Sequence, residues 1–114
     1  MIPAFFYHIV TPLQWEVFDD SIYFETPSLK TEGFIHASTA EQVEATANRY
    51  YKDEPVIWLL KIEAARVNAE LKYELATSVN EYFPHIYGPL NKDAILEVLE
   101  FEASEDGTFK IENI

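Results

Sequence analysis

The seven-residue run Val56–Ile62, VIWLLKI, constrains the fold more than any other stretch of this sequence. All but one of its residues are apolar, and valine, isoleucine and tryptophan favour extended backbone. A strand that is apolar at nearly every position has to be covered on both of its faces. We therefore predict a central, fully buried strand here, with the rest of the fold built around it.

Other segments have the pattern of partner strands. The apolar, β-prone run 5–10 ends at Pro12 and predicts a first strand, and 34–37 predicts a short strand. In 71–75, leucine and tyrosine alternate with lysine and glutamate, which is typical of a half-buried strand. The segment 94–103 fits a helix or a strand, and we favour a strand because its last residues alternate between apolar and acidic.

The end of the chain contains a turn signal. Asp106-Gly107 is a dipeptide that favours a tight hairpin turn, and it is followed by TFKIENI, residues 108–114. We predict a return strand there. In contrast, residues 83–90 hold two prolines and a glycine, so we expect a shaped loop at that point.

Two short helices are predicted near the start of the chain. Thr11 is a plausible N-cap with Pro12 at the first helical position, and Leu13, Val17 and Phe18 would then share the inward face. A second, single turn of helix is possible at 27–30.

A longer helix is predicted at about Thr39–Tyr51. Ser38-x-x-Glu41 has the pattern of a capping box, and Thr39-x-x-Gln42 repeats it one residue later. Helical periodicity would turn four residues inward, namely Val43, Ala47, Tyr50 and Tyr51.

These elements together predict an α+β fold in one domain, residues 1–114. Hydrophobic residues make up 48% of the chain and aromatic residues 15%, enough for one core of large rings. The sequence has no cysteine, which excludes disulfides and thiolate chemistry. The N-terminal segment lacks the basic start of a signal peptide, and no apolar run nears the ~18 residues of a membrane span, so we expect a cytoplasmic protein.

The charge of the chain limits its partners. Twenty acidic and eight basic residues give a net charge of −12. Nucleic acids and anionic membranes are bound by clustered lysine and arginine, so we expect neither as a partner. A small molecule is the remaining partner class, and the oligomeric state is left open.

Three histidines, His8, His36 and His85, are the strongest candidates for chemistry. Each has apolar or aromatic neighbours, so each could also be a buried side chain satisfied by a backbone carbonyl. His8 and His36 both lie near the end of a predicted strand, and the helix after Ser38 would add free N–H groups that favour an anion. We predict that these two imidazoles face a common hollow.

Further candidates surround the histidines. The aromatic residues Tyr82, Phe83 and Tyr87 either form a stacking wall for a ring or cover the edge of the core. Glu74 could orient an imidazole or stabilise a cationic transition state, or it could simply face solvent. Ser38 lies two residues from His36, but capping alone accounts for it.

A metal site is the main alternative chemistry. The three histidines with Glu74 or Glu32 have the composition of a zinc site, but no pair has the short local spacing of helical metal motifs. We therefore assign no metal ligand.

Several motifs in a fixed order resemble a known family. They are YHIV, SLKTEGFIHASTAEQ, ANRYY, LLKIE, LKYE and FPHIYGPL. In this order they are similar to the domain of unknown function 952 family (DUF952) of small bacterial proteins, over about residues 6–98.

The resemblance implies an ADP-ribosyltransferase-like fold, with a split, strongly curved, mixed or antiparallel sheet and two or three short helices. It implies that His8 contacts the ADP-ribose part of NAD, and that His36 is similar to the second-motif histidine of RNA 2′-phosphotransferases. The third catalytic element would be Glu74, with His85 or Tyr87 as substitutes. The scarcity of arginine departs from the phosphotransferase pattern and argues against an RNA 2′-phosphate substrate.

We therefore expect an ADP-ribosyltransferase-like enzyme that uses NAD or a related nucleotide as substrate and has no certain cofactor. His8, His36 and Glu74 would be catalytic. The ligand-binding residues would be Phe34, Ser38, Thr39, Tyr82, His85 and Tyr87. The alternatives are a non-catalytic protein that binds a nucleotide-like ligand on the same fold and, behind it, a histidine-ligated metal site.

Overall fold

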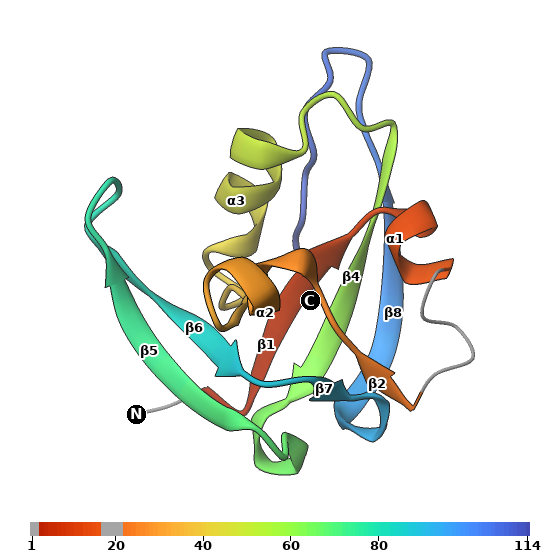
Figure 1. Cartoon of the computed structure of the whole chain (residues 1–114). Helices are drawn as coiled ribbons and strands as arrows, with labels where there is room; N and C mark the ends of the chain where they lie inside the picture. Colours follow the sequence, from red (N-terminus) through yellow and green to blue (C-terminus); the bar gives the residue numbers. More distant parts are fainter. Residues whose placement is uncertain (1–2, 17–21) are drawn as a thin grey trace.

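Short helices alternate with antiparallel strands along the chain (Figure 1). The structure is a computed structural model that describes residues 3–16 and 22–114. The strands are β1 (Phe5–Val10), β2 (Tyr23–Phe24), β3 (Ile35–His36), β4 (Val56–Glu63), β5 (Glu70–Ala76), β6 (Glu81–Tyr87), β7 (Leu90–Asn91) and β8 (Ile95–Glu102). The α-helices are α1 (Pro12–Glu16), α2 (Pro27–Thr31) and α3 (Val43–Tyr50), and single 3₁₀ turns lie at Ala64–Arg66 and Lys92–Ala94. This confirms the α+β class and its antiparallel strands.

Strand β4 is the centre of the first sheet, whose order is β1-β4-β8. Its residues Ile57, Leu59, Leu60 and Ile62 have no exposed surface, because β1 and β8 flank the strand and side chains pack on both faces. The predicted central strand is therefore confirmed, as is the choice of strand for β8.

A second sheet has the order β3-β6-β5, and β2 pairs with β7. The two three-stranded sheets are joined just after β3, where Tyr7 and Ser38 exchange two backbone hydrogen bonds of 2.8 Å. Figure 1 shows β5 and β6 curving away from the β1-β4-β8 sheet, with α2 and α3 drawn between the two.

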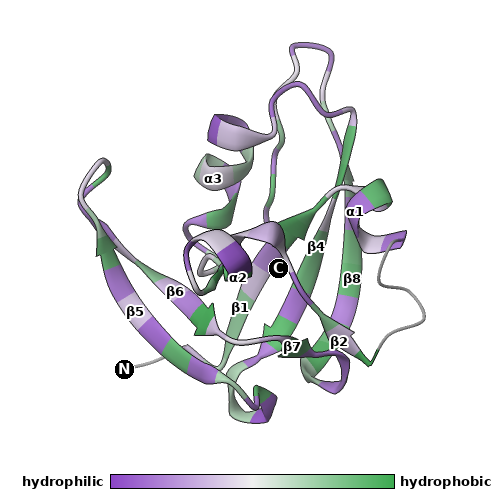
Figure 2. Cartoon of the chain, viewed as in Figure 1, coloured by the Kyte–Doolittle hydropathy of each residue, from purple (hydrophilic) through white to green (hydrophobic). Residues whose placement is uncertain are grey.

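Buried residues form two clusters. One lies around Phe6, Phe24 and Leu60, and the other around Val43, Leu59 and Phe109. Figure 2 shows hydrophobic stretches along β4 and an alternation of hydrophobic and hydrophilic residues along β5. The alternation agrees with the half-buried strand predicted there.

Helix α1 begins with the predicted cap. The Thr11 hydroxyl accepts from the Gln14 backbone N–H at 3.2 Å, and the Gln14 side chain accepts from the Thr11 N–H at 2.8 Å. The inward placement of Leu13 was wrong, because its side chain is 71% exposed, and in this helix Trp15 packs on the core. Val17 and Phe18 lie outside the described residues. The short helix predicted at 27–30 is confirmed as α2.

Helix α3 begins at Val43, four residues later than predicted. Ser38 does not cap it, because both backbone groups of Ser38 pair with Tyr7 and its hydroxyl donates to Thr46 Oγ1 at 3.2 Å. Val43 and Ala47 are fully buried as predicted, whereas Tyr50 is 67% exposed and not inward.

The loop predicted around Pro84 was wrong, because this segment is strand β6. The carbonyl of Pro84 accepts from the Ala37 N–H at 3.1 Å, which places the proline nitrogen on the side of β3. The ladder with β5 therefore loses no hydrogen bond, and on the β3 side the Ala37–Pro84 pair keeps one of its two bonds, directly after the end of β3 at His36. Gly88, directly after β6, approaches Ala69 so closely that a Cβ would lie 3.0 Å from the alanine methyl.

The return strand predicted at the C-terminus was also wrong, although the turn at Asp106-Gly107 forms. Residues 108–114 are irregular and are bonded to α3. Asn48 accepts from the Phe109 N–H at 2.7 Å and donates to its carbonyl at 3.0 Å, and Glu44 accepts from the Ile111 N–H at 2.7 Å. Side chains of α3 thus satisfy backbone N–H and C=O groups of this segment that would otherwise pair with a neighbouring strand.

In the part of the chain that the structure describes, no helix is both long enough and apolar enough to cross a membrane.

Candidate functional site

The three histidines lie on three strands that meet at the junction of the sheets. His36 on β3 and His85 on β6 are directly opposite in the antiparallel register, with ring centroids 5.4 Å apart. His8 lies on β1, one residue from the bridge to Ser38. All three line the same cleft. The predicted convergence of His8 and His36 agrees with this geometry.

His8 is held in one protonation state and one tautomer. Its Nδ1 lies 2.5 Å from the His36 carbonyl oxygen, and because a carbonyl only accepts, the hydrogen is on Nδ1. Burial, with a smaller contribution from the nearby His36 ring, lowers the pKa of His8 to about 4 against the opposing effect of the His36 carbonyl. At neutral pH the ring is uncharged, and Nε2 presents a lone pair.

His36 is paired with a carboxylate. Its Nε2 lies 2.9 Å from Glu32 Oε2, and the two side chains are 55% and 49% exposed. Glu32 follows directly on α2, and a turn at Gly33, whose φ of +90° glycine adopts without strain, returns the chain to β3. The short helix therefore supplies the partner of the histidine on the next strand.

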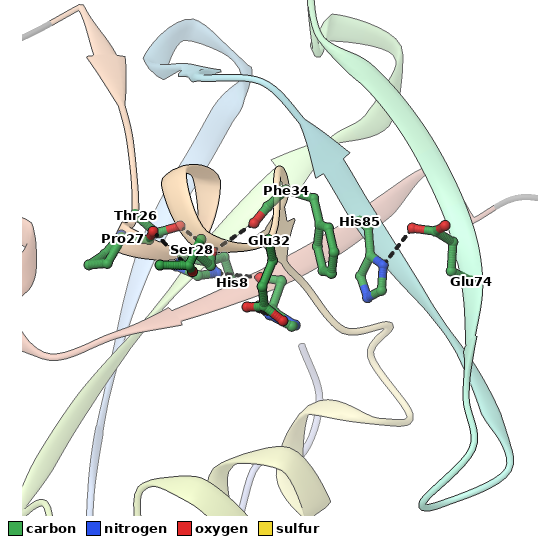
Figure 3. A network of polar contacts seen from close by, with 10 residues as sticks. His8, Thr26, Pro27, Ser28, Glu32, Phe34, Glu74 and His85 are labelled. Atoms are coloured by element: carbon green, nitrogen blue, oxygen red, sulfur yellow. Dashed lines mark hydrogen bonds and ion pairs between the residues drawn. The ribbon is translucent and has the colours of Figure 1, made fainter.

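His85 has a similar arrangement on β6. Its Nδ1 lies 2.8 Å from Glu74 Oε1, and the same oxygen accepts from the Tyr87 hydroxyl. These two bonds lower the pKa of Glu74, so the carboxylate is ionised at neutral pH. The Phe34 ring stacks on His85 at 4.0 Å, and Figure 3 shows His85 between Phe34 and Glu74.

One prediction follows from the shared oxygen. The Glu74 carboxylate raises the pKa of the Tyr87 phenol, because it accepts the phenolic hydrogen and repels the phenolate. Glu74→Gln is therefore expected to lower the pKa of Tyr87 towards 10, measured as phenolate absorbance against pH, with Tyr87→Phe identifying the band. Glu70→Gln, which removes a more distant charge, should have the smaller effect. Identical curves for Glu74→Gln and the wild type would contradict the bond.

The cleft has a volume of about 1130 Å³, somewhat larger than the roughly 300–1,000 Å³ typical of small-molecule sites. Its walls come from β1, α2, α3 and the β5–β6 hairpin. Besides the histidines, its lining includes Phe24, Glu25, Thr26, Ser28, Lys30, Ser38, Thr46, Arg49, Tyr50, Tyr51, Ser78 and Phe83.

Not every predicted site residue lies in the cleft. Ser38 does, together with the histidines. Phe34, Glu74 and Tyr87 instead pack behind or beside His85, outside the lining. Thr39 donates its backbone N–H to the Gln42 side chain, and Tyr82 is 61% exposed on the outer part of β6, so neither lines the cleft.

Several lining residues were not identified from the sequence. Of the three aromatic residues predicted as a stacking wall, Phe83 lines the cleft and Tyr82 and Tyr87 do not. Because β6 is a strand, Phe83 and His85 share one face whereas Tyr82 turns to the other. Tyr50, Lys30 and Arg49 depend on how α2 and α3 pack, and no local pattern gives that. Among residues 3–16 and 22–114, no group of three or more His, Asp or Glu side chains is arranged to hold a metal ion.

Comparison with known proteins gives a family match and close structures. The family described as "Protein of unknown function (DUF952)" matches residues 9–98. The crystal structure of protein CC0527 from Caulobacter crescentus superposes with a TM-score of 0.83 at 27% identity, covering 93% of each chain. The solution NMR structure of CC0527 superposes with a TM-score of 0.79 at 27% identity, covering 93% of this chain and 91% of that one. No curated protein matches the chain significantly.

Proposed function

The chain belongs to the DUF952 family, whose function is unknown, and we propose from its site that it binds NAD or a related nucleotide as an ADP-ribosyltransferase-like enzyme. The observation that carries this proposal is the meeting of His8, His36 and His85, from three strands, in one large cleft. Packing of the core does not by itself require three histidine side chains to line the same cleft.

The shape of the sheet supports the proposal. Two antiparallel three-stranded sheets are joined by the bridge between Tyr7 and Ser38, and the second sheet curves away from the first. This is similar to the split, curved sheet around the NAD cleft of ADP-ribosyltransferases. The likeness is an analogy of fold, so the residues of the site have to carry the functional argument.

The hydrogen-bonding state of His8 selects for hydroxyl groups. Because Nδ1 is used by the His36 carbonyl and the ring is neutral, Nε2 can only accept a hydrogen bond from a ligand. Ribose hydroxyls are donors of this kind, whereas phosphate oxygens are not. The exposed Tyr50 ring and Phe83 offer apolar surfaces on which a base or nicotinamide ring would stack.

The proposed reaction breaks the glycosidic C–N bond of NAD. Nicotinamide leaves with the electron pair of that bond, and an oxocarbenium-like centre develops on the ribose. Glu74 would act through His85 as a positioning residue, because its carboxylate bonds Nδ1 and leaves Nε2 available to the ligand. The acceptor of the ADP-ribosyl group is not specified by the site.

The test is calorimetric titration with NAD. We expect saturable binding by the wild type and a loss of at least about tenfold in affinity for His36→Ala, in line with loss of one hydrogen bond to a charged or polarised group. His36 is half exposed, so the variant should remain folded by circular dichroism. Glu100→Ala, on the exposed side of β8, is the matched control and should bind as the wild type does. No binding up to millimolar NAD would refute the proposal.

A second candidate is binding without turnover. It is favoured by the position of Glu74, whose carboxylate is bonded to His85 and Tyr87 outside the cleft lining, while Glu25 is the one carboxylate among the described residues that line it. The two candidates differ in whether nicotinamide is released. Proton NMR of a stoichiometric mixture with NAD over a day would show free nicotinamide only for the enzyme.

A further inference from the structure

We infer that the cleft binds the anionic part of its ligand between Lys30 of α2 and Arg49 of α3, and that this part is a phosphate or diphosphate group. That the ligand has a nucleoside part depends on the proposed function. That it has an anionic part is inferred independently, from the charges of the residues that line the cleft. The ligand class is therefore a phosphorylated small molecule, in preference to a neutral nucleoside.

The first observation is the distribution of charge. The chain carries 20 acidic and 8 basic residues, so 24 lining residues drawn evenly from its 114 would include about four acids. The described lining residues include one acid, Glu25, and two bases, Lys30 and Arg49. A protein with a net charge of −12 repels anions, and the lining of this cleft carries less negative charge than the chain as a whole.

The second observation is that the histidines do not supply the positive charge. His8 is buried and neutral at physiological pH. His36 and His85 are each bonded to a glutamate, at 2.9 and 2.8 Å, so even a protonated ring would be compensated by its own partner. An anionic ligand in this cleft therefore needs cations from elsewhere in its lining.

The third observation is that Lys30 and Arg49 are not compensated. In the described part of the chain neither lies within 4.0 Å of a carboxylate, whereas Arg66 pairs with Glu63 at 2.9 Å and Lys72 with Glu70 at 4.0 Å. Arg49 lies over the Tyr50 ring, with its guanidinium carbon 5.7 Å from the ring centroid. A guanidinium held on a ring at the wall of a cleft keeps its N–H donors free for a bidentate bond to phosphate.

The position of the two cations fits a ligand that spans the cleft. Helices α2 and α3 both contribute to its walls, and they come from separate segments of the chain. Figure 2 shows hydrophilic residues on both helices. A group with several acceptor oxygens, such as a diphosphate, could bond a lysine and an arginine at once.

The experiment compares four ligands, ADP-ribose, ADP, adenosine and inorganic pyrophosphate, by calorimetric titration of the full chain. We expect ADP-ribose and ADP to bind at least about tenfold more tightly than adenosine. Lys30→Gln and Arg49→Gln should each weaken ADP-ribose about tenfold and leave adenosine unchanged. Raising NaCl from 50 to 500 mM should weaken ADP-ribose but not adenosine. Both residues are exposed, so the variants should fold.

Arg66→Gln and Lys110→Gln remove one positive charge each from outside the lining and serve as matched controls, with affinities expected to equal that of the wild type. Equal ADP-ribose affinity in Lys30→Gln, Arg49→Gln and the controls would overturn the anion site, and so would equal affinity for ADP-ribose and adenosine, or no binding of any of the four. Pyrophosphate binding that depends on Lys30 and Arg49, without NAD binding, would refute the proposed function and retain the anion site.

Discussion

Replacing Phe109 with alanine is expected to lower the free energy of unfolding by about 3–5 kcal/mol, the usual range when a buried phenylalanine is truncated. The Phe109 side chain is 1% exposed and packs in the second cluster with Val43 and Leu59. The Asn48 side chain bonds both the N–H and the carbonyl of residue 109, so the backbone cannot easily move inward. The alanine would therefore leave a cavity between α3 and the sheet. Urea denaturation followed by circular dichroism measures the change.

Phe5→Ala is the matched control for Phe109→Ala. Phe5 is also a phenylalanine but is 38% exposed at the start of β1, so its truncation should cost much less. If the two variants had the same midpoint and slope in urea, the irregular C-terminal segment would contribute no more to the core than a surface residue does, contrary to its burial.

Acid is expected to destabilise the protein through His8. Burial lowers the pKa of His8 from 6.5 to about 4 in the folded chain, so the unfolded chain binds more protons in this interval. Stability is therefore fully retained above pH 6.5 and falls as the pH drops towards 4, by up to about 3 kcal/mol from this residue.

His8→Asn isolates this contribution. Asparagine can still donate to the His36 carbonyl but does not titrate. Stability should therefore be measured for both proteins by urea denaturation at pH 7, 5.5 and 4. The acidic residues titrate in both chains, so the difference between the two curves reports His8 alone. The wild type should lose about 3 kcal/mol more than the variant between pH 7 and pH 4. Parallel curves would mean that the His8 ring is accessible to protons and is not held neutral by burial.

The strands could be predicted where the pattern of side chains alone determines burial. Val56–Ile62 is apolar at every position except Lys61, and only a central strand covers so many apolar side chains on both faces. The errors arose where a tertiary contact replaced a local signal. Ser38 has the sequence of a helix cap but its backbone pairs with Tyr7, and residues 108–114 have the sequence of a strand but are bonded by side chains of α3. Pro84 indicated a loop, because the sequence does not show that the proline nitrogen faces the end of the short strand β3 and not the long partner strand β5.

The candidate site could be predicted where local sequence pattern places a residue, and not where tertiary packing does. His8 and His36 could be identified together because each lies near the end of a predicted strand. His85 was identified in a segment predicted to be a loop, and its position opposite His36 followed only once that segment was seen to be strand β6. Glu74 was correctly associated with a histidine, but its contact is with His85 on the neighbouring strand and not with His8 or His36. Lys30 and Arg49 could not be assigned to the cleft, because their helices are short and their placement depends on the packing of the whole chain.

The join between Tyr7 and Ser38 has a mechanical consequence. Two backbone hydrogen bonds of 2.8 Å and the bond from His8 Nδ1 to the His36 carbonyl link the sheets there. Tyr7, His8, Ala37 and Ser38, on either side of the join, all line the cleft. Breaking these three bonds would leave the ladders within each sheet intact, so the join is where the fewest hydrogen bonds hold the two sheets together. A ligand that contacts residues on both sides of this join would hold the two sheets together. Binding in the cleft would therefore make the whole fold more rigid.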